Sequence, residues 1–471
     1  MVTPAGERYT QQYDADSRRT TLLLGLGSKR EYRYDSVGRI TTQIEYNAAG
    51  QRIYTMVDSY DAVGNRVKRV ANGNPTTWLY DDAHRLIGQQ KSGQAATFAY
   101  DANSNLTTKW HQGGNPQTMQ YDAADRLTTM QSGGTTTTFQ WGLRGVMARQ
   151  YQTGSPVATY SYTDINNNLR VAQDAAGLTT STYDGDNLRR KIVAGSVTTT
   201  FVWDGSDYLQ IKPSSGDATL LVVLQGEVIG HVKGSEKRDY IVDPLGSVVA
   251  YLNSSQTITD QFEYWPYGEL ISEVETGTDP FLWVGSLGYF RDSDLRTYIR
   301  AREYRQDLGS WMQLDPLWPS EPALGYVKGR PVSATDPLGL FSMDEFWCCA
   351  KVGSGGWLAG CLAGVGQGCL WCVYLALAHC IIDPPGCPAG LAACGTVCGG
   401  GVARCLAAGA LAGTVAFVGC ITSGACAPKP PPGPIDCFVV CAQYAINTQA
   451  RRECMQNCGR NKCRYPYLGE R

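Results

Sequence analysis

The sequence of 471 residues is poor in histidine, a side chain on which many enzymes depend. It contains four histidines, His84, His111, His231 and His379, which are scattered along the chain. No Gly-x-Ser-x-Gly, His-Glu-x-x-His or phosphate-binding loop motif is present. Each isolated histidine is more simply explained as a loop or sheet residue. We therefore predict no cofactor site and, apart from self-cleavage, no catalytic activity.

The sequence also lacks an excess of positive charge. Its formal net charge is −2 at pH 7, whereas binding to nucleic-acid phosphates requires a basic surface. A nucleic-acid partner is therefore not expected. The first twenty residues are charged and polar, and the apolar run 21–27 is too short for a secretory signal. The chain is expected to begin inside a repeat array, either as a fragment of a longer protein or as a protein exported by a specialised system.

Cysteine is absent from the first 347 residues, and all 17 cysteines lie between Cys348 and Cys463. Composition changes at the same point, from polar and β-patterned to rich in Gly, Ala and Cys. A boundary near Leu340 is therefore predicted. Together with a change of motif near residue 235, it divides the chain into three parts. These are a repeat ribbon over 1–235, a denser motif region over 236–340 and a variable tail over 341–471.

What fills the first part is a Tyr-Asp pair that recurs about every twenty residues. A fixed period means that one small unit is repeated many times, and the repetition decides the fold. From Tyr60 the aromatic positions advance by 20 or 21 residues each time. Complete pairs include those that begin at Tyr34, Tyr60, Tyr80, Tyr100, Tyr121 and Tyr183, and degenerate copies begin at Trp141, Tyr162 and Trp203.

One unit, residues 76–100, shows the local logic. Residues 76–80 are β-branched and aromatic and predict a strand, and a second strand is predicted to restart at 85–87. The Asp81 carboxylate can accept a backbone N–H two residues later and close an Asx-turn. Each unit is therefore predicted to be a hairpin of two short strands. The apolar residues that follow each aromatic, such as Leu86 after Tyr80, are expected on the same buried face. The fold class is mainly β.

A family becomes visible after the repeats. The chain there carries Tyr240-Ile-Val-Asp-Pro-Leu-Gly, Tyr264-Trp-Pro-Tyr-Gly, Leu295-Arg-Thr-Tyr-Ile-Arg-Ala-Arg-Glu-Tyr, Gly309-Ser-Trp-Met-Gln-Leu-Asp-Pro and Asp336-Pro-Leu-Gly-Leu. With the repeats, this order closely resembles the Rhs/YD-repeat family and its repeat-associated core domain, over roughly residues 10 to 340. The resemblance implies an antiparallel β-hairpin ribbon that spirals into a partial shell, with the core domain closing one end and a variable segment after Leu340.

The resemblance also implies self-cleavage by two aspartates. Asp315 and Asp336 match the two family positions, and the scissile bond would be Leu340–Phe341. Two adjacent carboxylates do not both ionise easily, so one retains a proton. In aspartic proteases the charged one activates water and the neutral one polarises the carbonyl. The alternative is structural, because Asp-Pro-x-Gly is a good turn former. Asp243-Pro244-Leu245-Gly246 contains the same motif with no cleavage role expected.

The tail allows several interpretations. Residues 352–382 and 405–428 contain no Asp, Glu, Lys or Arg, and each run is long enough to cross a bilayer as a helix. Membrane or cell-surface contact through 352–428 is one possibility. The twin spacing Cys437-x3-Cys441 and Cys454-x3-Cys458 favours a disulfide-stapled helical hairpin, and the odd cysteine total allows an intermolecular disulfide. A zinc site at Cys369-x2-Cys372 is disfavoured, because no second such pair exists.

Two functions remain in competition. In the first, an exported bacterial Rhs protein, secreted or at the cell surface, uses its shell to scaffold and deliver a toxin-like tail. A cognate immunity protein would then be a partner. In the second, a cell-surface structural or interaction protein carries a crosslinked or membrane-associated tail and performs no catalysis. Any chemistry is expected to lie outside the Tyr-Asp period, at Asp315 and Asp336.

Overall fold

The computed structural model describes residues 7–163, 166–274, 279–316, 318 and 322–340, which belong to one compact unit of the chain. Every prediction that falls on 341–471 lies outside the described residues. This applies to Phe341, the disulfides, the helical tail and the membrane contact through 352–428. Among the described residues, no helix is both long and apolar enough to cross a membrane.

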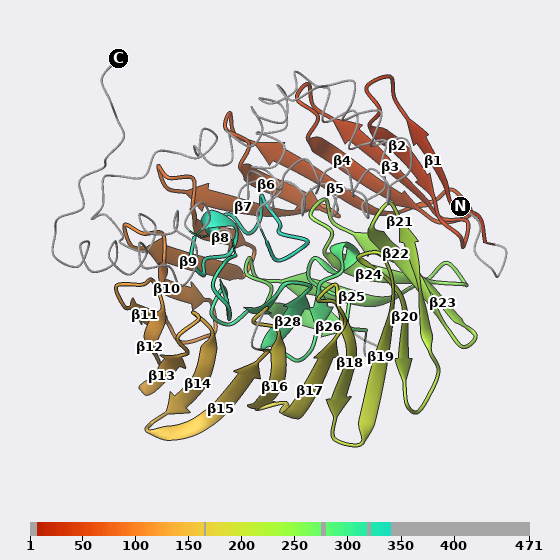
Figure 1. Ribbon diagram of the computed structural model, residues 1–471. Helices are drawn as coiled ribbons and strands as arrows, with labels where there is room; N and C mark the ends of the chain where they lie inside the picture. Colours follow the sequence, from red (N-terminus) through yellow and green to blue (C-terminus); the bar gives the residue numbers. More distant parts are fainter. Residues whose placement is uncertain (1–6, 164–165, 275–278, 317, 319–321, 341–471) are drawn as a thin grey trace, which may run out of the picture. The chain divides into compact units, whose positions relative to one another are not determined.

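A single antiparallel ribbon of 26 strands makes up most of the fold, and each strand pairs with the next one in sequence (Figure 1). Its first half comprises β1 Thr10–Tyr13, β2 Arg19–Leu23, β3 Lys29–Tyr34, β4 Ile40–Tyr46, β5 Arg52–Tyr60, β6 Arg66–Ala71, β7 Asn74–Tyr80, β8 Leu86–Lys91, β9 Gln94–Tyr100, β10 Leu106–His111, β11 Gln117–Tyr121, β12 Leu127–Ser132 and β13 Thr135–Trp141. The second half comprises β14 Met147–Gln152, β15 Ser155–Tyr162, β16 Leu169–Asp174, β17 Gly177–Tyr183, β18 Arg189–Ala194, β19 Val197–Asp204, β20 Asp207–Pro213, β21 Thr219–Leu224, β22 Glu227–Lys233, β23 Glu236–Val242, β24 Val248–Asn253, β25 Ile258–Tyr264 and β26 Leu270–Val274. The predicted hairpin repeat is confirmed. The sheet continues across residue 235 and ends at Val274.

The aspartate of each pair closes the turn as predicted. In the unit over 76–100, Asp81 Oδ1 accepts the N–H of Ala83 at 3.0 Å and that of Arg85 at 2.8 Å. The other carboxylate oxygen, Oδ2, accepts Arg85 Nε at 2.7 Å. The guanidinium of Arg85 then reaches the next unit, where it donates to Asp101 O at 2.8 Å and lies over the Tyr100 ring. The aspartate therefore shapes its own turn and also orients a link between consecutive units.

The aromatic of each pair has a role that the sequence did not reveal. Its hydroxyl or indole N–H donates to a backbone carbonyl of the preceding unit, as Tyr100 does to Leu86 O at 2.9 Å and Trp141 does to Leu127 O at 2.7 Å. The aromatic also marks a register shift, since the pairing of β7 with β8 slips between Leu79 and Tyr80. A β-bulge bends a strand and increases its twist. Repeated once per unit, it curves the ribbon.

The inner face of the ribbon forms the core. The predicted aromatic and aliphatic partners share this face, since Trp78, Leu86, Phe98 and Leu106 are all buried in one cluster. Residues pointing the other way, such as Leu79, are exposed. This alternation is that of a sheet with one face covered.

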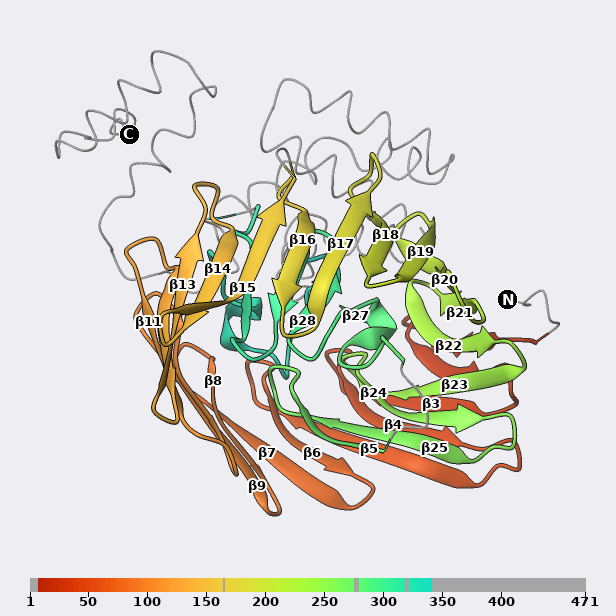
Figure 2. The same cartoon turned by 90° about the horizontal axis from the view of Figure 1, so that it is seen from below.

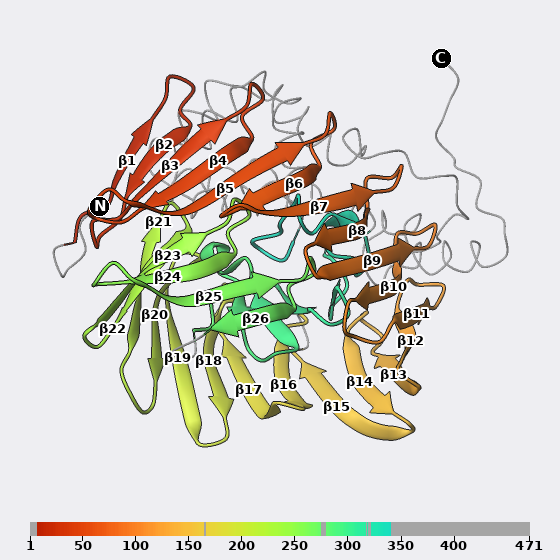
Figure 3. The same cartoon turned by 180° about the vertical axis from the view of Figure 1, so that it is seen from behind.

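The two ends of the ribbon lie against each other. Figure 2 shows β3–β5 beside β23–β25, and Figure 3 shows the same contact from another side. Arg19 forms two hydrogen bonds to Glu227, at 2.7 and 2.8 Å, and Gln43 Nε2 donates to Val242 O at 2.5 Å. Ser28 Oγ donates to buried Asp239 at 2.9 Å. Side chains rather than backbone pairing therefore join the start of the ribbon to its end.

Residues 279–340, with 317 and 319–321 undescribed, form an inner segment that packs on the concave face. It contains a second sheet of four strands, β27 Phe290–Arg291, β28 Arg296–Ile299, β29 Arg302–Arg305 and β30 Ser310–Trp311. The short 3-10 helices η1 Gly285–Leu287 and η2 Val327–Gly329 flank it. An aromatic cluster including Trp283, Tyr289, Tyr304, Trp311 and Tyr326 fills its centre.

Candidate functional site

Strand β29 separates two buried polar clusters, because successive side chains of a strand point to opposite faces. Arg302 and Tyr304 face one way, and Glu303 and Arg305 face the other. All four side chains are buried. The side of Arg302 meets the turn before Leu340, and the side of Glu303 meets the ribbon. The strand thus positions both groups through one short stretch of backbone.

Arg302 brings together the two aspartates predicted from the sequence. Its Nη1 lies 2.7 Å from Asp315 Oδ2, and its Nη2 lies 2.9 Å from Asp336 Oδ2. All three residues are at most 5% exposed. The guanidinium lies over the ring of Trp311, with its central carbon 3.9 Å from the ring centroid. Arg302 was missed in the sequence, although a buried arginine needs an ionic or hydrogen-bonding partner.

The same arginine also holds the peptide that precedes the predicted scissile bond. Arg302 Nε donates to Gly339 O at 2.5 Å, and Asp336 Oδ1 accepts the N–H of Leu340 at 2.9 Å. Gly339 has a φ of +69°, and a Cβ there would lie 2.4 Å from Ile299 O. Only glycine fits this turn.

A tyrosine pair holds the other side of the turn. Tyr289 OH donates to Asp336 O at 2.9 Å, and the Asp336 N–H donates back to the same hydroxyl at 3.1 Å. The Tyr326 hydroxyl lies 2.9 Å from that of Tyr289. Burial raises the pKa of both phenols, so they act as neutral hydrogen-bonding groups. The backbone of Asp336 is therefore fixed as firmly as its side chain.

Electrostatically the site is a cation between two anions. A positive charge within hydrogen-bond reach of both carboxylates offsets their mutual repulsion. The sharing of a proton between the two carboxyl groups stays a prediction, and the structure adds that both lie within 3 Å of the same guanidinium. Asp315 and Asp336 are therefore brought together, but in a paired arrangement rather than as a bare dyad.

The other Asp-Pro-Leu-Gly turn reproduces this cluster elsewhere in the fold. Arg69 Nη1 lies 2.6 Å from Asp243 Oδ2, and Arg69 also binds both oxygens of Asp58 at 2.8 Å. Asp243 Oδ1 accepts the N–H of Ser247 at 2.8 Å, the position that Leu340 occupies relative to Asp336. The turn of this second cluster connects β23 to β24 inside the continuous sheet, and its partners Asp58 and Arg69 lie in β5 and β6.

The histidines are sheet or loop residues in the described part of the chain, as predicted. His84 lies in a turn with a φ of +63°. His111, in β10, stacks on Trp265 with ring centroids 4.6 Å apart. His231, in β22, contacts Tyr240 OH at 2.9 Å and Asp279 at 3.0 Å. None of the three lies beside Asp315 or Asp336 in these contacts.

Comparison with known proteins points to one family. The profile of the teneurin YD-shell family matches residues 8–321. Salivary gland surface protein 1 of Aedes aegypti is 23% identical over 145 residues, which are 29% of this chain and 4% of that protein. The TcdB2–TccC3 complex aligns with a TM-score of 0.46 and 16% identity, covering 70% of this chain and 22% of that chain. The Photorhabdus luminescens Tc holotoxin pore aligns with a TM-score of 0.44 and 15% identity, and the alignment covers 72% of this chain and 21% of that chain. The chain thus spans about a fifth of the length of these structures.

Proposed function

The chain belongs to the teneurin YD-shell family, and we propose that its ribbon is the wall of an exported shell that scaffolds and delivers residues 341–471. Family membership confirms the resemblance drawn from the Tyr-Asp repeats and the motifs after Tyr240. The ribbon is curved, its two ends lie against each other and its inner face is covered. These features support the role of a shell, because the inner face of such a ribbon is shielded from solvent. The tail acts outside the producing cell, either secreted or at the cell surface, and its partner is a small cognate immunity protein.

Release of the tail occurs by self-cleavage after Leu340. The observation that supports this is the convergence of Asp315, Asp336 and the Gly339 carbonyl on the Arg302 guanidinium, with the Leu340 N–H donating to Asp336. One carboxylate takes a proton from water, whose oxygen attacks the Leu340 carbonyl. The other carboxyl gives its proton to the departing nitrogen of Phe341. The peptide bond breaks, and a carboxylate and an amine are formed.

Arg302 sets a condition on this step. Because it pairs both carboxylates, neither is poised as a proton donor while the pairing persists. The reacting state requires Arg302 to release one aspartate and to keep its contact with Gly339 O. The arginine then acts as a gate on the reaction as well as a support for the turn.

Intact mass spectrometry of the purified protein at neutral pH tests cleavage directly. We expect two fragments, one ending at Leu340 and one beginning at Phe341, and a single intact chain for Asp336→Asn. Asp243→Asn is the matched control, since it changes the equivalent carboxylate of the second cluster and should leave cleavage complete. Neutral pH matters because Asp-Pro bonds also break in acid. An intact wild-type chain, or equal cleavage of wild type and Asp336→Asn, contradicts the proposal.

A second candidate function is that of a cell-surface structural or interaction protein without catalysis. The Asp58–Arg69–Asp243 cluster favours it, because the same chemistry there only locks a turn of the sheet. Producing the full chain with and without export to the periplasm of a test bacterium separates the two. Growth arrest by the wild type, relieved by Asp336→Asn, supports delivery of a released effector. Absence of arrest in every case supports the structural role.

A further inference from the structure

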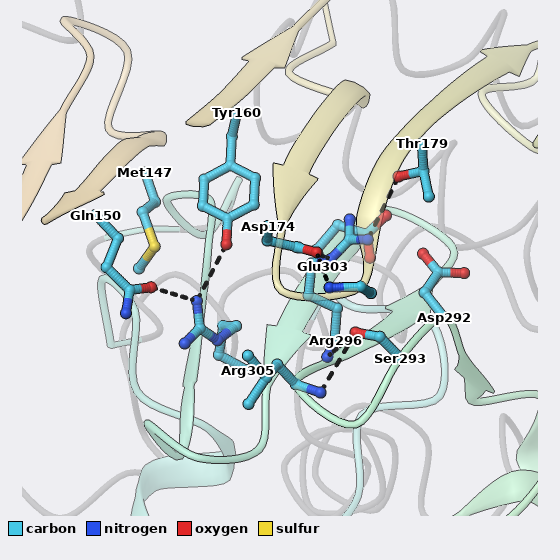
Figure 4. A network of polar contacts seen from close by, with 12 residues as sticks. Met147, Gln150, Tyr160, Asp174, Thr179, Asp292, Ser293, Arg296, Glu303 and Arg305 are labelled. Atoms are coloured by element: carbon cyan, nitrogen blue, oxygen red, sulfur yellow. Dashed lines mark hydrogen bonds and ion pairs between the residues drawn. The ribbon is translucent and has the colours of Figure 1, made fainter. Parts of the chain in front are cut away.

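The inner segment meets the ribbon at a second buried cluster, on the face of β29 opposite Arg302. Figure 4 shows Arg296, Glu303 and Arg305 pointing toward Asp174 and Tyr160 of the ribbon. We call this contact the ribbon joint and define it by Asp174, Arg189, Asp292, Arg296 and Glu303. Two of these residues come from β16 and β18, and three come from β28, β29 and the loop before β28.

Within the ribbon joint, four charges are matched in pairs. Arg189 binds Asp292 through two hydrogen bonds of 2.6 and 2.7 Å. Arg296 Nε lies 2.9 Å from Asp174 Oδ2. Every one of these side chains is at most 3% exposed. Both pairs link the ribbon to the inner segment, so they hold the two together as well as neutralising each other.

Glu303 is the fifth group and has no cation of its own. Its side chain is 1% exposed, and its Oε1 lies 3.8 Å from Arg189 Nη1, beyond hydrogen-bond distance. Neither carboxyl oxygen has a hydrogen-bond partner among the described residues. An isolated buried carboxylate is costly, and such a group takes up a proton instead.

The surroundings of Glu303 agree with that expectation. Burial raises the pKa of its carboxyl to about 8, the charges of Asp292 and Asp174 act in the same direction, and Arg189 and Arg296 oppose it. The charged and titratable groups that interact with it from the neighbouring strands and loops are Asp174, Asp292, Arg189, Arg296, Tyr162, Tyr183 and Tyr298. Burial raises the pKa of each tyrosine, so none of them offers a charge.

We propose that Glu303 is a proton-dependent latch, which holds a proton while the ribbon joint is closed and opens the joint between β28–β29 and β16–β18 when the proton is lost. With Glu303 neutral, the joint contains two guanidinium and two carboxylate charges and is balanced. With Glu303 ionised, it holds an unmatched buried negative charge. The latch does not depend on self-cleavage and applies equally to a chain that remains intact.

The direction of the pH effect follows from linkage. The closed joint binds the proton more tightly than an open joint, where the carboxyl has its ordinary pKa near 4. Protonated Glu303 therefore stabilises the closed joint fully in acid. This stabilisation is lost as pH rises through the pKa that Glu303 has in the closed joint. The opening constant should rise roughly tenfold for each pH unit between about 5 and about 8 and level off above that range.

Hydrogen-exchange mass spectrometry of the full chain measures this opening. Peptides covering β28 and β29 are compared between wild type and Glu303→Gln at several pH values, and the ratio at each pH removes the intrinsic pH dependence of exchange. The wild-type to Glu303→Gln ratio of opening constants should rise roughly tenfold per unit up to pH about 8 and then flatten. A ratio that does not change with pH overturns the proposal.

The chain offers a matched control in Asp307, a half-buried carboxylate near the same strand that is paired with Arg305 through two hydrogen bonds. Asp307→Asn should leave the pH dependence of opening at β28–β29 as in the wild type. Should Glu303→Gln not fold, the wild type alone decides. The exchange rate in β28–β29 must then increase relative to the exchange rate in β7 as pH rises. A ratio of the two rates that stays constant with pH overturns the latch.

Discussion

The repeat unit makes a quantitative prediction at Asp81. Replacing Asp81 with alanine removes three hydrogen bonds, to the N–H groups of Ala83 and Arg85 and to Arg85 Nε. It also frees Arg85, whose guanidinium bridges to Asp101 O and to the ring of Tyr100. The perturbation therefore removes a turn lock and a link between two consecutive units.

The expected magnitude comes from burial. Hydrogen bonds to a charged group contribute about 1.5–3 kcal/mol when buried, and exposed ion pairs contribute below about 1 kcal/mol. The Asp81 side chain is 23% exposed and that of Arg85 is 17% exposed, so the site is intermediate. We expect Asp81→Ala to cost about 2 kcal/mol, or about a 30-fold rise in the local opening constant. Asp81→Asn keeps an acceptor for the turn but loses the charge facing Arg85. We expect it to cost about 1 kcal/mol, or about a fivefold rise in the local opening constant.

Hydrogen-exchange mass spectrometry over residues 74–91 reads this opening locally, which suits a repeat protein whose unfolding need not be all-or-none. Peptides over 207–224 serve as the distant reference. The matched control is Asp82→Ala, the adjacent exposed aspartate of the same turn, for which no change is expected. Equal effects of Asp81→Ala and Asp82→Ala would refute the assignment of the turn lock to Asp81.

Two further predictions concern the contacts between consecutive repeat units and the contact between the two ends of the ribbon. Tyr60→Phe removes one hydrogen bond, to Ile40 O at 2.8 Å. Tyr100→Phe removes those to Leu86 O, Tyr267 OH and Gly329 O, at 2.9, 2.7 and 3.5 Å. In urea unfolding we expect the free energy of unfolding to fall by about 1 kcal/mol for Tyr60→Phe and by about 2–3 kcal/mol for Tyr100→Phe. Equal losses for the two variants would contradict the hydrogen bond from the aromatic side chain to the carbonyl of the preceding unit. At the contact between the ribbon ends, burial raises the pKa of Asp239 to about 7. The contribution of protonated Asp239 to stability is full in acid and is lost as pH rises through 7. The melting temperature of the wild type, measured relative to that of Asp239→Asn, should therefore fall between pH 5 and pH 8. A constant difference between the two melting temperatures would show that Asp239 does not titrate in this range.

The repeat could be predicted from the sequence because its determinants are local. The Asx-turn of Asp81 needs only residues 81–85, and the alternation that buries Trp78 and exposes Leu79 is a property of any strand. The curvature was less accessible, because it depends on a register shift between paired strands rather than on a side-chain type. The aromatic hydroxyls were missed for a similar reason. Their acceptor is a carbonyl of the previous unit, and a sequence does not say which backbone group lies opposite.

The site was predicted in part, for a comparable reason. Asp315 and Asp336 belong to turn motifs that are legible as short patterns, and they do lie on one guanidinium. Arg302 and Glu303 belong to a strand that is buried on both faces, where ordinary alternation gives no signal of which charge meets which partner. Arg302 finds two carboxylates, while Glu303 faces a network already matched by Arg189 and Arg296. The partners of Arg302 lie 13 and 34 residues later in the inner segment. Asp174 of β16 and Arg189 of β18 lie more than a hundred residues before Glu303.

The two Asp-Arg-Asp clusters differ in the groups that their arginine binds. At Asp243 the arginine commits its Nε to Asp58, and the turn continues into β24, so every contact serves the sheet. At Asp336 the arginine instead turns its Nε to the Gly339 carbonyl, and Tyr289 clamps the backbone of the aspartate. The carboxylates are alike in both places, and the difference lies in the donors aimed at the peptide. An Asp-Pro-Leu-Gly motif is therefore a turn lock in itself. Any cleavage chemistry depends on the groups that Arg302 and Tyr289 add, so Arg302→Lys, which keeps the charge but loses the fork, is expected to impair cleavage more than Arg69→Lys.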